Sequence, residues 1–174
     1  LYHKDVVFAT LIPAEKWLYD WYGRCGYTLH ITCTPPPPGV DSMDFAAFND
    51  WQQTRDCVLL HDEEGFDIIK EDYRIALSID PNARRQTADI PAMIRIINAE
   101  KALQLYAARH PDCTENIRVY NDSDIPMNNT YFQIRNGHVS HTDRPLPGTR
   151  PLTIVELADY IFKDDRLEMN LMLN

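Results

Sequence analysis

The sequence predicts an α/β fold of the α+β type, with a mainly antiparallel sheet and flanking helices. Short runs of β-branched and apolar residues, such as VVFATLI at 6–12, alternate along the chain with segments of helical periodicity. Two of the helical segments have clear start signals. Asn98 stands where an N-cap is expected, and Thr153 with Glu156 forms the pattern of a capping box.

The first part of the chain predicts a strand–helix–strand unit. We expect strands over 6–12 and 27–34, because both runs are rich in apolar and β-branched residues. Between them, a helix is predicted over 15–22. Trp17 and Trp21 share one side of that helix, and we expect this aromatic side to be buried.

Four successive prolines at 35–38 mark the clearest break in the chain, since they can continue neither a helix nor a strand. Beyond them we expect helices over 44–53 and 63–73, the second capped by Asp62. The segment 77–89 has weak periodicity and is predicted to be a connector.

The pattern of the last part of the chain predicts one compact α/β unit over 93–174. We expect that the segment 6–34 does not share the core of this unit. Its helices are expected at 99–109 and 154–162, and Asn136-Gly137 is a typical two-residue hairpin turn. An apolar tail follows at 167–174. The predicted strands of this unit span 93–97, 116–120, 130–134 and 138–141.

Composition limits the function. The 174 residues carry 17 basic and 26 acidic side chains, for a net charge of −9. This charge disfavours nucleic acid and anionic membrane surfaces as partners, because both attract basic patches. No apolar stretch approaches a membrane span, and the start does not resemble a signal peptide. The four cysteines form no CxxC pair, so we expect reduced thiols and a cytoplasmic location.

Motifs for chemistry are sparse. His138, His141 and Asp143 share a predicted hairpin, but no further ligand is placed beside them, so we predict no metal site. The turn 121–124 contains two aspartates yet lacks the glycine and distal glutamate of a calcium loop, and we expect a connecting turn. No glycine-rich phosphate loop and no GxSxG motif occur.

Two stretches resemble a known family. The segment LIPAEKWLYDWYGRCGY at 11–27 resembles the last strand–helix–strand of GNAT acetyltransferases, which ends in a Tyr-x-x-x-Gly-Phe pattern; here it begins at Tyr22 and ends at Tyr27. The segments MIRIINAEKALQLYA, IRVYNDSDIPMNNTYFQIRNG and LTIVELADYIF, with the ending MNLMLN, resemble the sterol-carrier-protein-like C-terminal domain of Eis-type (enhanced intracellular survival) acetyltransferases. Together these segments extend over more than half of the chain.

The resemblance implies three regions: C-terminal elements of a GNAT fold at 1–34, a linker with connecting helices at 35–90, and a sterol-carrier-protein-like domain at 91–174. It also implies the C-terminal portion of a bacterial N-acetyltransferase, with acetyl-CoA as co-substrate and a small-molecule or peptide amine as acceptor. The family's Arg/Gln-x-x-Gly-x-Gly/Ala pyrophosphate loop is missing, so we expect it upstream and expect little activity from this chain alone.

Two catalytic residues follow from the resemblance. Tyr22 matches the tyrosine that protonates the departing CoA thiolate; alternatively, it belongs only to a buried aromatic face with Trp17 and Trp21. Asn174 would supply the terminal carboxylate that helps to activate the amine; alternatively, the tail is frayed. A different class of function also stays open, a non-enzymatic sterol-carrier-like module that binds a small apolar ligand or a partner. We leave open whether the chain forms a homo-oligomer.

Overall fold

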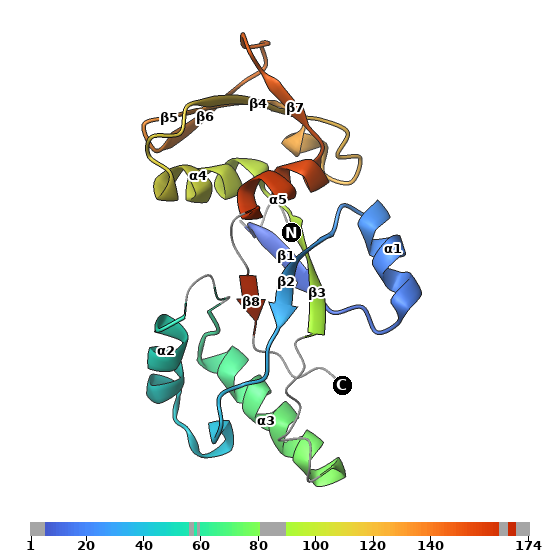
Figure 1. Ribbon diagram of the computed structural model, residues 1–174, viewed down its shortest axis with the longest axis vertical. Helices are drawn as coiled ribbons and strands as arrows, with labels where there is room; N and C mark the ends of the chain where they lie inside the picture. Colours follow the sequence, from blue (N-terminus) through green and yellow to red (C-terminus); the bar gives the residue numbers. More distant parts are fainter. Residues whose placement is uncertain (1–5, 56–57, 59, 81–89, 164–166, 170–174) are drawn as a thin grey trace. The chain divides into compact units, whose positions relative to one another are not determined.

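The structure is a computed structural model that describes residues 6–55, 58, 60–80, 90–163 and 167–169. Its described residues form a mixed α/β fold with five α-helices and two four-stranded mixed sheets, which confirms the predicted fold class (Figure 1). The chain divides into two compact units. Unit 1 comprises 1–30 and 93–164, and unit 2 comprises 31–92 and 165–174.

The first sheet, sheet A, has the strand order β1-β3-β2-β8. Strand β1 is antiparallel to β3, with Phe8 opposite Ile96, and β2 is parallel to β8, with Ile31 opposite Leu167. The bounds are Phe8–Leu11 for β1, Thr28–Cys33 for β2, Ile90–Ile96 for β3 and Leu167–Met169 for β8. Strand β8 lies where we had expected only an apolar tail.

The expectation that 6–34 does not share the core of 93–174 was wrong. Strand β1 pairs along its whole length with β3, and the ring of Phe8 lies 5.5 Å from that of Phe162 in the last helix. All four residues of β1 are partly buried, and the C-terminal part of the chain supplies both the partner strand and the ring that packs on Phe8. As a statement of family relationship, the division into 1–34, 35–90 and 91–174 stays a prediction.

Helix α1, Lys16–Arg24, confirms the predicted helix but not its buried aromatic side. No residue of α1 is buried, and Trp17 and Trp21 are 64% and 51% exposed. Helical spacing shows which side chains share a face. It does not show whether another element covers that face.

The second sheet, sheet B, lies in unit 1 and has the order β6-β5-β4-β7. Helices α4, Ala99–Arg109, and α5, Ile154–Phe162, lie on one of its faces (Figure 1) and begin and end where predicted. The β4–β5 and β5–β6 pairs are antiparallel and the β4–β7 pair is parallel. The strands are β4 Glu115–Val119, β5 Tyr131–Arg135, β6 His138–Thr142 and β7 Arg150–Leu152, of which β7 was not predicted.

Local signals explain why these elements form where they do. The side chain of Asn98 accepts a hydrogen bond from the Lys101 amide, and Thr153 and Glu156 make both bonds of the capping box. Asn136 and Gly137 have φ values of 51° and 74°, which is the backbone that a type I′ hairpin turn requires. The core between sheet B and its helices contains Leu103, Ile117, Phe132, Ile134 and Leu157, all almost fully buried.

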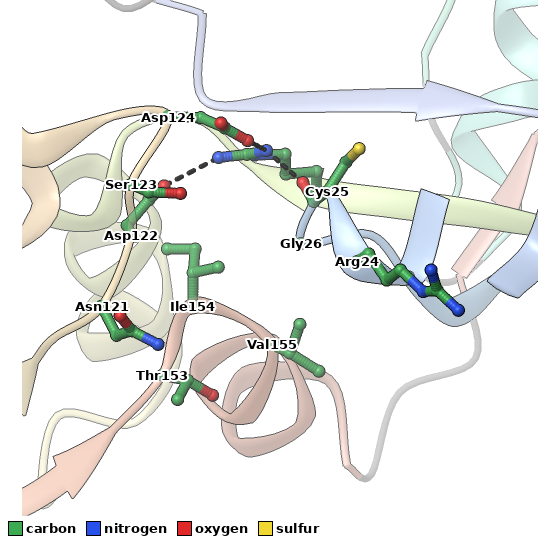
Figure 2. A pocket seen from close by; sticks show the side chains of 12 residues that line it. Arg24, Cys25, Gly26, Asn121, Asp122, Ser123, Asp124, Thr153, Ile154 and Val155 are labelled. Atoms are coloured by element: carbon green, nitrogen blue, oxygen red, sulfur yellow. Dashed lines mark hydrogen bonds and ion pairs between the residues drawn. The ribbon is translucent and has the colours of Figure 1, made fainter. Parts of the chain in front are cut away.

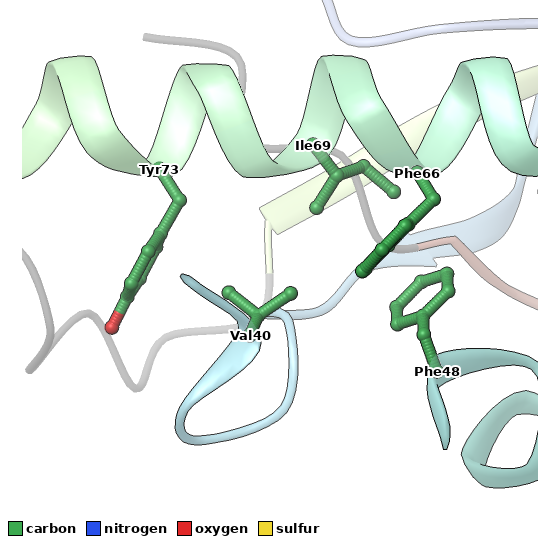
Figure 3. Packing of buried hydrophobic residues seen from close by; sticks show 5 residues of the cluster. All are labelled: Val40, Phe48, Phe66, Ile69 and Tyr73. Carbon is green, nitrogen blue, oxygen red and sulfur yellow. The ribbon is translucent and has the colours of Figure 1, made fainter. Parts of the chain in front are cut away.

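Unit 2 is built around aromatic and aliphatic side chains from three helical elements. These are the 3-10 helix η2, Val40–Ser42, and the helices α2, Phe45–Gln53, and α3, Glu63–Ile79. The core residues are Val40, Phe48, Phe66, Ile69 and Tyr73 (Figure 3).

The helices of unit 2 largely follow the prediction. Asp44 caps α2 and Asp62 caps α3, each accepting a hydrogen bond from a backbone amide three residues on. Helix α3 runs six residues beyond its predicted end at 73, because Ala76 continues its buried side. The predicted connector therefore begins later, and its residues 81–89 lie outside the described residues.

Candidate functional site

A polar pocket of about 220 Å³ lies within unit 1. Four segments that are distant in sequence line it (Figure 2): 23–26 at the end of α1, Arg95 of β3, the loop 121–124 that follows β4, and 153–155 at the start of α5. The pocket thus lies where the end of α1 meets β3, the loop after β4 and the start of α5.

Arg95 connects three of these segments. Its Nη2 donates to Asp122 Oδ1 at 2.8 Å and its Nη1 donates to Asp124 Oδ2 at 2.7 Å. Nη1 also donates to the backbone carbonyl of Cys25. The Arg95 side chain is only 7% exposed, so its charge is stabilised by these carboxylates and not by water.

Asp122 is the most buried of the pocket's charged groups, at 2% exposure. Its carboxylate accepts further hydrogen bonds from the Ile125 amide and from Asn128 Nδ2, at 3.1 and 2.8 Å. Asn129 accepts a hydrogen bond from the Asp122 amide at 2.8 Å. The acidic turn therefore connects two elements, as predicted, and also stabilises the structure, because its carboxylates compensate the charge of Arg95.

Gly26 allows the turn after α1 to approach the start of α5. Its φ is +82°, and a Cβ atom there would lie 3.0 Å from Ile154 Cγ2 and 3.4 Å from Arg95 Cζ. A side chain at this position would meet both a strained backbone and two close neighbours. Only glycine fits without displacement.

The electrostatics of the pocket are mixed. Arg24 and Arg95 contribute two positive charges, Asp122 and Asp124 contribute two negative ones, and the N-terminus of α5 adds partial positive charge. The Asp124 side chain is 59% exposed, unlike that of Asp122. The pocket therefore suits a polar ligand that carries both a cationic group and hydrogen-bond acceptors.

Tyr22 precedes the first pocket residue, on the last turn of α1. Its ring contacts Trp21 and Tyr27, with centroids 4.9 and 5.6 Å apart. Because Trp17 and Trp21 are exposed, a buried aromatic face that includes Tyr22 does not exist. Burial raises the pKa of the neighbouring Tyr27 phenol, and the Arg95 charge offsets part of that rise. The catalytic role of Tyr22 stays a prediction.

Other predicted sites have different outcomes. Asn174 and the tail from 170 onward lie outside the described residues, so the structure does not place the terminal carboxylate. His141 Nδ1 lies 3.3 Å from Glu100 Oε1. Among the residues that the structure describes, no group of three or more His, Cys, Asp or Glu side chains could hold a metal ion.

The sequence interpretation missed Arg95. A lone arginine within the apolar strand MIRII was the available signal, because a charge inside a buried strand requires a compensating partner. Its partners Asp122 and Asp124 were noted only as members of a turn.

The comparisons with known proteins add no relative. No protein-family model, no curated protein and no solved structure matches this chain. In the described part of the chain, every helix is too short or too polar to cross a membrane.

Proposed function

We propose that the chain is the C-terminal portion of an acetyl-CoA-dependent N-acetyltransferase of the GNAT superfamily, Eis type, and that Tyr22 is its general acid. The observation that supports this proposal most directly is the geometry at 22–27. Tyr22 lies on the last turn of a helix between two strands, and Gly26 then turns the chain beside a polar pocket. The proposal places the protein in the cytoplasm.

The proposed reaction forms one bond and breaks one. The acceptor nitrogen attacks the thioester carbonyl of acetyl-CoA, the new C–N bond forms, and the C–S bond breaks. The departing CoA thiolate then takes a proton from the Tyr22 hydroxyl, because a phenol is a suitable general acid for a thiolate. The acceptor nitrogen loses a proton to the solvent as the new bond forms.

The pocket supports an amine as the acceptor, whether a small molecule or a peptide. An amine is a cation before it reacts, and the partly exposed carboxylate of Asp124 offers it an opposite charge. Both aspartates pair with Arg95, but Asp122 is less suited to this task because its carboxylate is buried.

The test uses the polypeptide encoded by the complete gene, assayed for thiol release from acetyl-CoA with a panel of amines. Tyr22→Phe removes only the phenolic hydroxyl and is expected to lower kcat about 100-fold with little change in KM. Tyr19→Phe on the same helix is the matched control and should leave kcat unchanged. Equal turnover of the two variants would contradict the role of Tyr22.

A second measurement concerns the 174-residue chain itself. Because the sequence lacks the glycine-containing pyrophosphate loop of the family, we expect weak binding of acetyl-CoA and little or no acetyl transfer. Micromolar affinity for acetyl-CoA in calorimetry of this chain would show that the cofactor site lies within it.

A further inference from the structure

The outer face of sheet B, opposite α4 and α5, has an unusual set of side chains. Residues alternate along each strand, so Ile117, Phe132 and Ile134 point to the helices and their neighbours point away. The pairing of Arg118 with Tyr131, Gln133 with Ser140, and Arg135 with His138 sets the lateral neighbours. The outer face is formed by Asn116, Arg118, Tyr120, Tyr131, Gln133, Arg135, His138, Ser140 and Thr142.

This face is cationic although the protein is acidic. It holds two arginines and a histidine and no carboxylate, whereas the whole chain carries 26 acidic residues. Glu115 belongs to β4 but faces the other way, and its carboxylate lies 3.6 Å from Arg150. Neither Arg118 nor Arg135 forms an ion pair with any residue that the structure describes.

Arg118 is held in place by aromatic rings. Its Cζ lies 5.4 Å from the centroid of Tyr131 and 6.0 Å from that of Tyr120. These cation–π contacts orient the guanidinium without neutralising it. Its N–H groups therefore remain available for a bidentate contact with a carboxylate.

We propose that the outer face of sheet B is a docking surface for an acidic, extended segment of another polypeptide. Tyr131, which lies opposite Arg118, and Arg135 are four residues apart on β5, a separation of about 13 Å along a strand. Two carboxylates four residues apart in an extended peptide have the same spacing. Gln133 lies between Tyr131 and Arg135 on the same face of β5 and donates to Asn116 Oδ1, and Ser140 lies opposite it on β6, where its hydroxyl offers a hydrogen bond to the peptide backbone.

Charge complementarity favours this occupant over a nucleic acid. Single-stranded nucleic acids bind through bases stacked on free aromatic faces, but the guanidinium of Arg118 already lies over both tyrosine rings. A polyphosphate chain also brings one negative charge per nucleotide toward a protein of net charge −9. A short segment with two carboxylates needs only the two arginines. This inference does not depend on the proposed acetyltransferase activity.

The experiment measures fluorescence anisotropy of a fluorescein-labelled peptide, acetyl-Glu-Thr-Val-Thr-Glu-amide, titrated with the protein at low ionic strength. We expect saturable binding. The affinity should fall about tenfold in Arg118→Gln and in Arg135→Gln, because each variant loses one charge-assisted contact with the peptide. Arg74→Gln is the matched control, because it removes one positive charge from the surface of α3 in unit 2, and it should bind like the wild type.

Three outcomes would overturn the proposal. The first is equal affinity of the wild type and the three variants for the peptide. The second is equal binding of a peptide with both glutamates replaced by glutamine. The third is tighter binding of a fluorescein-labelled oligothymidylate than of the peptide in the same buffer. Far-UV circular dichroism of each variant checks that it folds, which is expected because both arginines are exposed.

Discussion

The two units of this protein are organised around different kinds of interior. Unit 1 holds a buried ion pair, Arg95 with Asp122, beside its hydrophobic core. Unit 2 is centred on stacked aromatic rings, and the ring centroids of Phe48 and Phe66 are only 4.7 Å apart. An ion pair depends on each partner's charge, whereas an aromatic cluster depends on volume and shape. The two units should therefore respond to different substitutions.

The largest effect is expected in unit 1. Asp122→Asn preserves the shape of the side chain but leaves Arg95 with only one carboxylate, the exposed one. We expect a loss of about 3 kcal/mol in the free energy of unfolding, measured in urea. Asp143→Asn, on an exposed loop, is the control. A loss below about 1 kcal/mol, within the range of an exposed ion pair, would mean that the pair is not a stabilising centre.

A smaller effect is expected at Gly26, where the end of α1 approaches Arg95. Gly26→Ala combines a positive φ with two close contacts and should cost about 2 kcal/mol. Gly148→Ala provides the comparison, because Gly148 also has a positive φ but no atom lies within 4 Å of its added Cβ. Equal losses in the two variants would show that the close contacts add nothing.

In unit 2, the informative substitution changes the volume of a core side chain and not its charge. Phe48→Leu keeps the cluster apolar but alters its shape, and we expect a loss of about 1.5 kcal/mol in urea unfolding. Phe45→Leu, at the partly buried edge of the same cluster, should lose less. Equal losses in Phe48→Leu and Phe45→Leu would show that the stacking of Phe48 on Phe66 adds no stability.

The smallest effect is a pH dependence in unit 2. Burial lowers the pKa of His61, and the charge of Asp62 opposes that shift only in part. The unfolded chain therefore binds a proton more readily than the folded one, so this contribution to stability is present above the unfolded pKa of about 6.5 and is lost as the pH falls below it. His61→Gln should flatten the decline in melting temperature between about pH 7.5 and 5.5. A parallel decline in both proteins would contradict the assignment.

The sequence predicted some elements to the residue and missed others for physical reasons. Helices α4 and α5 were predicted closely because their caps are local signals within a few residues. Strands β7 and β8 have three residues each, too few to show a pattern, and they exist because of their pairing partners. The pocket could not be predicted from any single segment, because Arg95 meets carboxylates that lie on a loop far along the chain.

The sequence separation of the Arg95 contacts has a consequence for how the protein folds. Its partners are 27, 29 and 70 residues away, whereas the β5–β6 hairpin closes over the two residues Asn136 and Gly137. Long loops are slower to close and cost more entropy, so the hairpin should form early and the arginine contacts late. A substitution at Arg95 should then accelerate unfolding in stopped-flow measurements while leaving the refolding rate almost unchanged.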